Sequence, residues 1–181
     1  MVVEALASRY GFGRARRRFQ GHFRTGEIGG APVALLRPAT FVNESGRSVS
    51  AAAAWYRLGP EEVLVCCDDI NLPLGRLRVR RGGSSGGHRG LASVIETLGT
   101  EAVPRLRVGI GPPLGGAARA QSVGAEQVSH VLGRFAPAEW SAVETAIDRA
   151  RDAAAAWVTE GIEVCMNAFN EAPPAGPGAS G

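Results

Sequence analysis

Hydrophobic and polar residues recur along this chain with both helical and strand periods. Apolar residues at helical spacing predict amphipathic helices over residues 1–10, 46–58, 88–98, 137–160 and 162–169. Short apolar or alternating runs predict strands over residues 19–27, 31–37, 63–67, 76–80 and 105–111. We expect a long loop over 112–125, a short apolar segment over 128–135 and a disordered tail over 171–181. The mixture of element types indicates one α/β domain over residues 1–170.

The stretch from residue 63 to residue 91 holds polar groups that suggest a functional site. Its apolar strand ends at Asp68, and a strand with one basic face follows over residues 76–80. A loop of glycine and serine over residues 82–87 then leads to His88 at the start of a helix. An acid at the carboxyl end of a strand, close to a loop and a helix start, is typical of sites in open α/β sheets. An ordinary turn residue and an ordinary surface loop are the alternatives.

The net charge of the chain is only +3, but its positive charges are unusual in type and in position. All 20 basic residues are arginine, and six of them lie between Arg9 and Arg24 with no acid among them. Such a local basic patch is of the kind that attracts RNA or DNA. A solvated face, or charges that protect the edge of a sheet, is the alternative interpretation.

Several classes of protein are disfavoured by what the sequence lacks. It has no apolar run of about 20 residues and no secretory signal, and its three cysteines form neither a disulfide framework nor a zinc motif. A phosphate-binding P-loop needs lysine, and no G-x-S-x-G motif of a serine hydrolase is present. We therefore expect a cytoplasmic protein that uses no metal and no cofactor.

Four segments, in order, resemble motifs of bacterial peptidyl-tRNA hydrolase. They are R-P-A-T-F-V-N-E-S-G at 37–46, D-D-I-N-L-P-L-G at 68–75, G-G-S-S-G-G-H-R-G-L at 82–91 and R-L-R-V-G-I-G at 105–111. The resemblance implies a single α/β domain with a mixed β-sheet flanked by helices. It also implies a monomeric enzyme without a metal that cleaves the ester bond between a peptide and the 3′ end of tRNA, and so recycles tRNA.

The resemblance assigns roles to three residues near the reacting ester. Asp68 would orient and charge the catalytic histidine, Asn43 would hold the water or the peptide end, and Phe41 would line the pocket for the tRNA end. Asn43 is also a candidate ligand-binding residue independently of the resemblance, because it lies in a polar turn where it fits no capping box. An ordinary turn residue is the alternative for Asn43.

Four further residues are expected to contact the substrate. His88 and Arg89 would lie at the substrate cleft, with Arg89 standing where the family has asparagine. Arg80 and Arg107 occupy positions at which the family binds the terminal phosphate of tRNA.

The chain departs from the family pattern at its beginning. The family starts with a central strand, a G-N-P-G turn and an R-H-N-x-G segment, whose histidine is the general base. Residue 1 of this sequence aligns at the first helix, so we expect these 181 residues to lack the central strand and that histidine. Two alternatives therefore stay open: a catalytically inactive member of the family that binds tRNA or other RNA, and an unrelated hydrolase that uses His88 with Asp68.

Overall fold

The computed structural model describes residues 1–111 and 140–171. The predicted loop over 112–125, the predicted apolar segment over 128–135 and the predicted tail beyond residue 171 lie outside these residues.

The described residues form five helices, two 3₁₀ turns and six strands. The helices are α1 (Val2–Arg9), α2 (Ser45–Tyr56), α3 (Arg89–Leu98), α5 (Trp140–Glu160) and α6 (Ile162–Phe169), with 3₁₀ turns η1 (Val42–Glu44) and η2 (Pro60–Glu62). The strands are β1 (Arg16–Arg18), β2 (Gly21–Ile28), β3 (Ala31–Pro38), β4 (Val65–Asp69), β5 (Leu77–Arg80) and β6 (Arg105–Gly109). The prediction of a mixed α/β domain is confirmed, and none of the described helices is long and apolar enough to cross a membrane.

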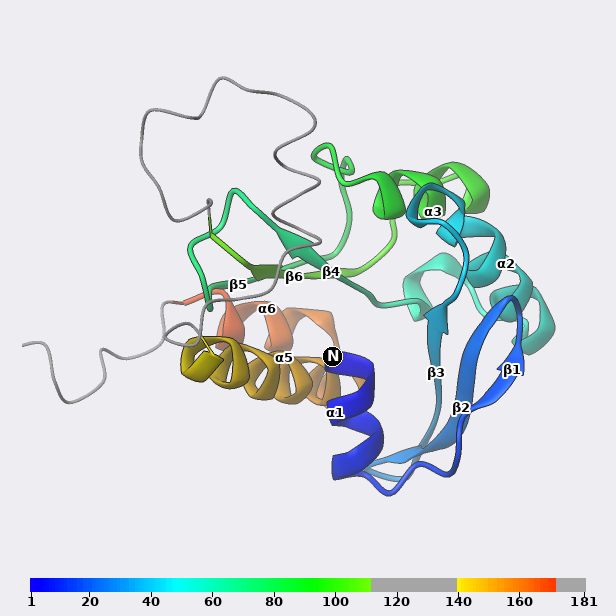
Figure 1. Ribbon diagram of the computed structural model, residues 1–181, viewed down its shortest axis with the longest axis horizontal. Helices are drawn as coiled ribbons and strands as arrows, with labels where there is room; N and C mark the ends of the chain where they lie inside the picture. The colour runs from blue at the N-terminus through cyan, green and yellow to red at the C-terminus, as the bar shows by residue number, and fades with distance from the viewer. Residues whose placement is uncertain (112–139, 172–181) are drawn as a thin grey trace, which may run out of the picture.

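The strands are arranged in two sheets of three (Figure 1). The first is antiparallel, in the order β1-β2-β3, and its β2–β3 hairpin turns at Gly29 and Gly30, whose φ angles of 60° and 83° suit glycine. The second has the order β4-β6-β5, with β4 parallel and β5 antiparallel to β6, so it is the mixed sheet. The prediction of a strand over residues 19–27 is wrong at its start, because Phe19 and Gln20 form the turn between β1 and β2.

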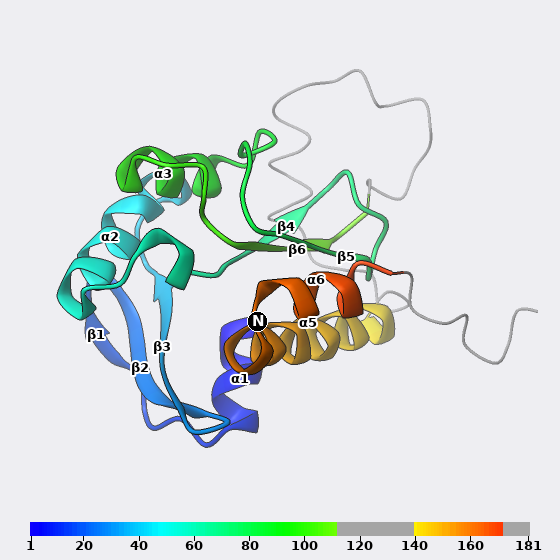
Figure 2. The same ribbon diagram turned by 180° about the vertical axis from the view of Figure 1, so that it is seen from behind.

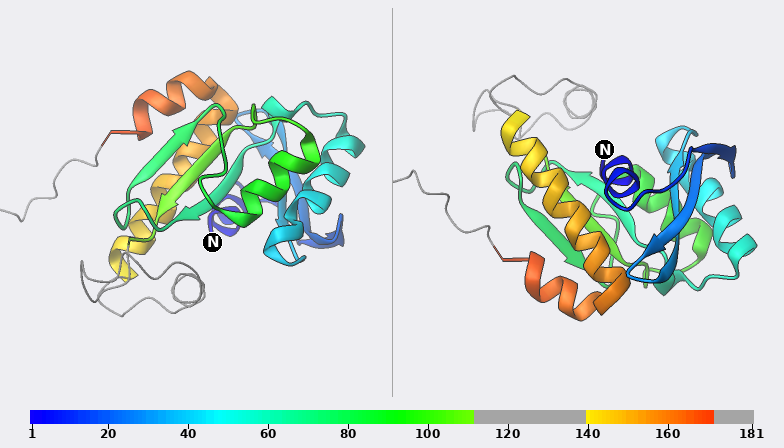
Figure 3. Two further views of the ribbon diagram at one scale, coloured as in Figure 1. Left: turned by 90° about the horizontal axis from the view of Figure 1, so that it is seen from above. Right: turned by 90° about the horizontal axis from the view of Figure 1, so that it is seen from below.

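Helices cover both faces of the mixed sheet. Helices α5 and α6 lie on one side and α3 lies on the other, with α2 beside it (Figures 1 and 2). The view from below shows α5 running along the strands (Figure 3). The core between them is apolar, and its fully buried members include Leu77, Val79, Leu106, Ala150 and Ala153. Small alanine side chains let α5 approach the sheet closely, which fixes the strands that carry the site.

An asparagine from the end of the described chain covers the outer edge of β5. The side-chain oxygen of Asn170 accepts a hydrogen bond from the Val79 amide at 2.6 Å, and its Nδ2 donates to the Val79 carbonyl at 3.1 Å. This pair replaces the partners that a further strand would supply, so the edge is satisfied at that point.

A groove separates the two sheets. Strands β3 and β4 are edge strands of their own sheets, and both line this groove, which has a volume of about 620 Å³. Its lining is mainly apolar and includes Leu35, Val65 and Trp157, and Asp68 and His88 also line it.

This groove leads to a prediction for the 181-residue chain. Open strand edges cost roughly 1–3 kcal/mol for each buried backbone group that stays unpaired, and a net stability of about 5–15 kcal/mol absorbs few such losses. We expect the chain to bind the dye ANS and to unfold with low cooperativity. Calorimetry and dye fluorescence measure both properties. A cooperative melt at high temperature without dye binding would contradict the prediction.

Candidate active site

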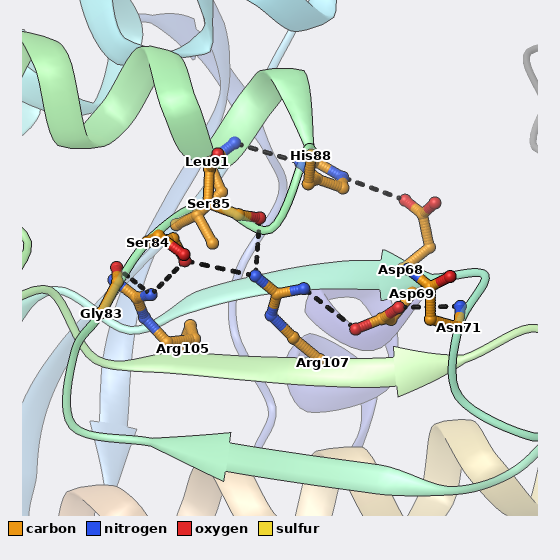
Figure 4. A network of polar contacts seen from close by, with 10 residues as sticks. All are labelled: Asp68, Asp69, Asn71, Gly83, Ser84, Ser85, His88, Leu91, Arg105 and Arg107. Atoms are coloured by element: carbon orange, nitrogen blue, oxygen red, sulfur yellow. Dashed lines mark hydrogen bonds and ion pairs between the residues drawn. The ribbon is translucent and has the colours of Figure 1, made fainter. Parts of the chain in front are cut away.

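The centre of the candidate site is a contact between the end of β4 and the start of α3. The Nε2 atom of His88 lies 3.3 Å from Oδ1 of Asp68 (Figure 4). The other ring nitrogen, Nδ1, accepts a hydrogen bond from the Leu91 amide at 3.1 Å, so the imidazole caps α3. Because Nδ1 accepts, the proton of the neutral ring is on Nε2 and is donated to Asp68.

This contact controls the charge of the carboxyl group. The hydrogen bond from His88 lowers the pKa of Asp68 below its ordinary value, and partial burial acts in the opposite direction. The lowering prevails, so Asp68 is ionised near neutral pH.

A glycine permits this close packing. A Cβ atom placed on Gly90 would lie 3.0 Å from Cε1 of His88 and 3.1 Å from Cγ2 of Val42. Any side chain at this position would therefore push the imidazole away from Asp68 or η1 away from α3. Gly90 thus brings the turn that contains Asn43 next to the start of α3.

The glycine-rich loop before α3 is fixed by Arg105 of β6. Its side chain is only 1% exposed, and it donates to the carbonyl groups of Val103 at 2.7 Å, Ser84 at 3.0 Å and Glu101 at 3.1 Å, and also to that of Gly83. Burial lowers the pKa of this guanidinium. The pattern of the sequence did not reveal this role, because an arginine in a strand is ordinarily an exposed residue.

Arg107, two residues further along β6, links the same loop to the second acid. Its Nη1 lies 2.9 Å from Oδ2 of Asp69, and its Nη2 donates to the Ser85 carbonyl at 2.6 Å. Oδ1 of Asp69, which is 7% exposed, accepts from the Asn71 amide at 2.9 Å. The contacts of Arg107 in this structure are therefore internal, and its expected binding to a phosphate stays a prediction.

The remaining predicted residues are exposed around this centre. Phe41 is 80% exposed, and Asn43 of η1 is also exposed, with no side-chain hydrogen bond to any described residue. Arg89 begins α3, and Arg80 ends β5; both are exposed, and within residues 1–111 and 140–171 neither lies within 4.0 Å of a carboxylate oxygen. Their roles toward a substrate stay predictions.

The cysteines of β4 are not nucleophiles in this arrangement. Burial raises the pKa of both Cys66 and Cys67 to about 12, so both are protonated thiols near neutral pH. Among the residues that the structure describes, no three histidine, cysteine, aspartate or glutamate side chains are grouped as metal ligands.

The fold and the site together define a class: a mixed α/β domain with an ionised carboxylate and an imidazole at the carboxyl end of a strand. The profile of the family described as peptidyl-tRNA hydrolase matches residues 1–176. The chain belongs to this family.

Individual relatives agree with this result. The chain is 46% identical over 178 residues to a peptidyl-tRNA hydrolase of Synechococcus sp. (strain JA-3-3Ab), covering 98% of this chain and 76% of that one. It is 44% identical over 170 residues to that of Synechocystis sp. (strain ATCC 27184 / PCC 6803 / Kazusa), covering 93% and 84%. The crystal structure of peptidyl-tRNA hydrolase from Acinetobacter baumannii superimposes with a TM-score of 0.83 at 34% identity, covering 96% and 85%.

A substitution tests how the pKa of Asp68 is set. In His88→Ala the carboxylate loses its hydrogen-bond donor, so we expect the pKa of Asp68 to rise. In the parent, the lowered pKa contributes stability above the ordinary value of 3.8, and this contribution is lost as the pH falls through the folded value. The pH dependence of stability in that window should therefore weaken in the variant. Carboxyl NMR titration and denaturant unfolding measure these effects. His22→Ala is the control, and an equal pKa change in it would contradict the prediction.

Proposed function

We propose that this protein hydrolyses the ester bond between a peptide and the 3′ end of tRNA, which releases a peptide carboxylate and a free tRNA hydroxyl. The observation that carries the proposal is the family match over residues 1–176, together with the meeting of three of its motifs at Asp68, His88 and η1. We further propose that it acts as a monomer in the cytoplasm on peptidyl-tRNA released from ribosomes.

Asp68 is proposed as the acid that orients a catalytic imidazole. Ester hydrolysis at neutral pH needs a base that removes a proton from water, and an ionised carboxylate holds such an imidazole in the correct tautomer. The lowered pKa of Asp68 suits this role. His88 does not suit the role of the base, because one nitrogen accepts from Leu91 and the other faces Asp68. We therefore propose His88 as a positioning residue.

Asn43 and Phe41 are proposed to bind the two sides of the ester. The side-chain amide of Asn43 has no hydrogen-bond partner among the described residues. Its NH2 group and its carbonyl oxygen are therefore both available to a water molecule or to the peptide end. Phe41 is largely exposed, and an exposed aromatic ring offers a surface on which a terminal base stacks. We place Arg89 at the border of this cleft.

The alternative of an inactive RNA-binding member is favoured by one observation. Within the described residues, no imidazole nitrogen that lacks a hydrogen-bond partner lies beside Asp68. The two functions differ in whether a peptide is released, so an activity measurement separates them.

The activity prediction concerns the general base. Since a positioned general base contributes about 10²–10⁴-fold, we expect the 181-residue chain to release peptide from peptidyl-tRNA weakly or not at all. A chain extended by a segment that carries R-H-N-x-G should recover activity, and Asp68→Asn should then remove most of it. Asp148→Asn, which changes an exposed carboxylate on α5, is the control. Full turnover by the 181-residue chain would show that its base lies within these residues.

A second prediction concerns the phosphate. Arg80 is exposed and lies across from buried Arg105 in the β5–β6 pair. Among the described residues no carboxylate oxygen lies within 4.0 Å of Arg80, so its charge is open to a substrate there. We expect Arg80→Ala to weaken tRNA binding and to lower the slope of log affinity against log salt by about 1. Arg107→Ala is also expected to weaken binding, but it removes the contacts to Asp69 and Ser85 as well. Unchanged affinity and slope in Arg80→Ala would refute the role of Arg80.

A further inference from the structure

A second basic surface lies on the outer strand of the first sheet, away from the Asp68–His88 contact. Strand β1 is a run of three arginines, Arg16–Arg18, which pairs only with β2 among the described strands. Arg16 and Arg17 are exposed. In the described part of the chain, no carboxylate oxygen lies within 4.0 Å of any of the three. This strand therefore carries three positive charges that no carboxylate of the described residues neutralises.

Aromatic rings hold one of these charges in place. The guanidinium carbon of Arg18 lies 4.0 Å from the ring centroid of Trp55 and 4.6 Å from that of Phe19. Trp55, at the end of α2, is 63% exposed. A guanidinium stacked on a ring is fixed in orientation but keeps the N–H groups at its edge, and these match a phosphate.

The turn after β1 is strained in a way that favours this arrangement. Phe19 and Gln20 have φ angles of 51° and 52°, in the region where two-residue hairpin turns normally use asparagine or glycine. The turn is tied down on two sides, since the Phe19 carbonyl accepts from the Ser48 hydroxyl and the Gln20 carbonyl accepts from the Ala39 amide at 2.9 Å. Such strain is found at sites where the position of a side chain has a function.

The opposite face of the same strand is also basic. Arg17 lies directly across from His22, and His22 lies directly across from Arg37. Glu4 of α1 lies 3.9 Å from Arg37, and among the described residues no carboxylate oxygen lies within 4.0 Å of Arg17. Arg17 therefore presents a positive charge on this face that an external anion can pair with.

We propose that β1, with Trp55, is a second RNA-binding surface that contacts the phosphate backbone of the tRNA body. This inference rests on the proposed function, because it takes tRNA as the ligand. The Gln20–Ala39 hydrogen bond ties this surface to the segment that leads into Phe41. One tRNA molecule would therefore place its 3′ end at the cleft and its backbone along β1.

The test compares two ligands. Deacylated tRNA reaches both surfaces, whereas a short oligonucleotide ending in C-C-A reaches only the cleft. We expect Arg16→Gln and Arg17→Gln each to lower the salt slope of tRNA binding by about 1, because each removes one phosphate contact. Binding of the short oligonucleotide should not change. Trp55→Ala should weaken tRNA binding as Arg18→Gln does, and Trp55→Phe should retain it.

Arg151→Gln is the matched control, since it removes one positive charge from α5, and it should leave the slope unchanged. Unchanged slopes in the β1 variants would overturn the inference, and so would an equal loss in the control or with the short oligonucleotide. Self-association of these variants with unaltered tRNA binding would show that the arginines only protect a sheet edge. Loss of binding to anionic vesicles without loss of tRNA binding would assign the surface to a membrane instead.

The two proposals fail in different ways. If the parent chain or its extended form releases peptide while the β1 variants bind tRNA normally, only the second surface is refuted. If the parent binds no tRNA, both proposals are refuted.

Discussion

The position of the glycine-rich loop depends on two guanidinium groups of one strand. Arg105 is buried and surrounded by backbone carbonyl groups, so among the described residues its charge is stabilised by dipoles and not by a carboxylate. Transfer of a charge from water to a protein interior is unfavourable unless such partners replace the water. The carbonyl groups of Gly83 and Ser84 in turn need a donor, because residues in an irregular loop have no neighbouring strand to pair with. The loop and Arg105 thus satisfy each other, and Arg107 binds the same loop at the Ser85 carbonyl while it pairs with the Asp69 carboxylate.

The fixed loop explains why a single imidazole can join two elements. His88 follows the loop directly, so its backbone is placed where the ring reaches Asp68 on one side and the Leu91 amide on the other. Both interactions favour the same tautomer, with the proton on Nε2. The same geometry makes His88 a poor base, because a base needs a lone pair that faces water. The charge on Asp68 and the start of α3 are therefore consequences of one side-chain orientation.

Periodicity in the sequence predicted most helices and strands, since apolar stripes decide which face is buried. It also placed Asp68 at a strand end and His88 at a helix start, which the structure brings together. It did not predict the contacts of Arg105 or Asn170, because both depend on partners distant in the chain. The turn at Phe19 was missed because local preference disfavours φ above zero for phenylalanine, and contacts with Ser48 and the aromatic cluster outweigh that preference.

Arginine has two opposite roles in this chain, one structural and one on the surface. The chain contains no lysine, so arginine fills both roles. In β6 the guanidinium groups point inward, and carbonyl groups or Asp69 neutralise them, so they contribute structure. In β1, an edge strand, Arg16 and Arg17 are exposed and Arg18 stacks on Trp55, and none of the three has a carboxylate oxygen within 4.0 Å among the described residues. Composition alone cannot separate the two uses, because each residue carries the same charge. Pairing separates them: a cation whose donors are satisfied within the protein has little left for a ligand, and one held only by aromatic rings keeps its hydrogen-bonding edge for phosphate.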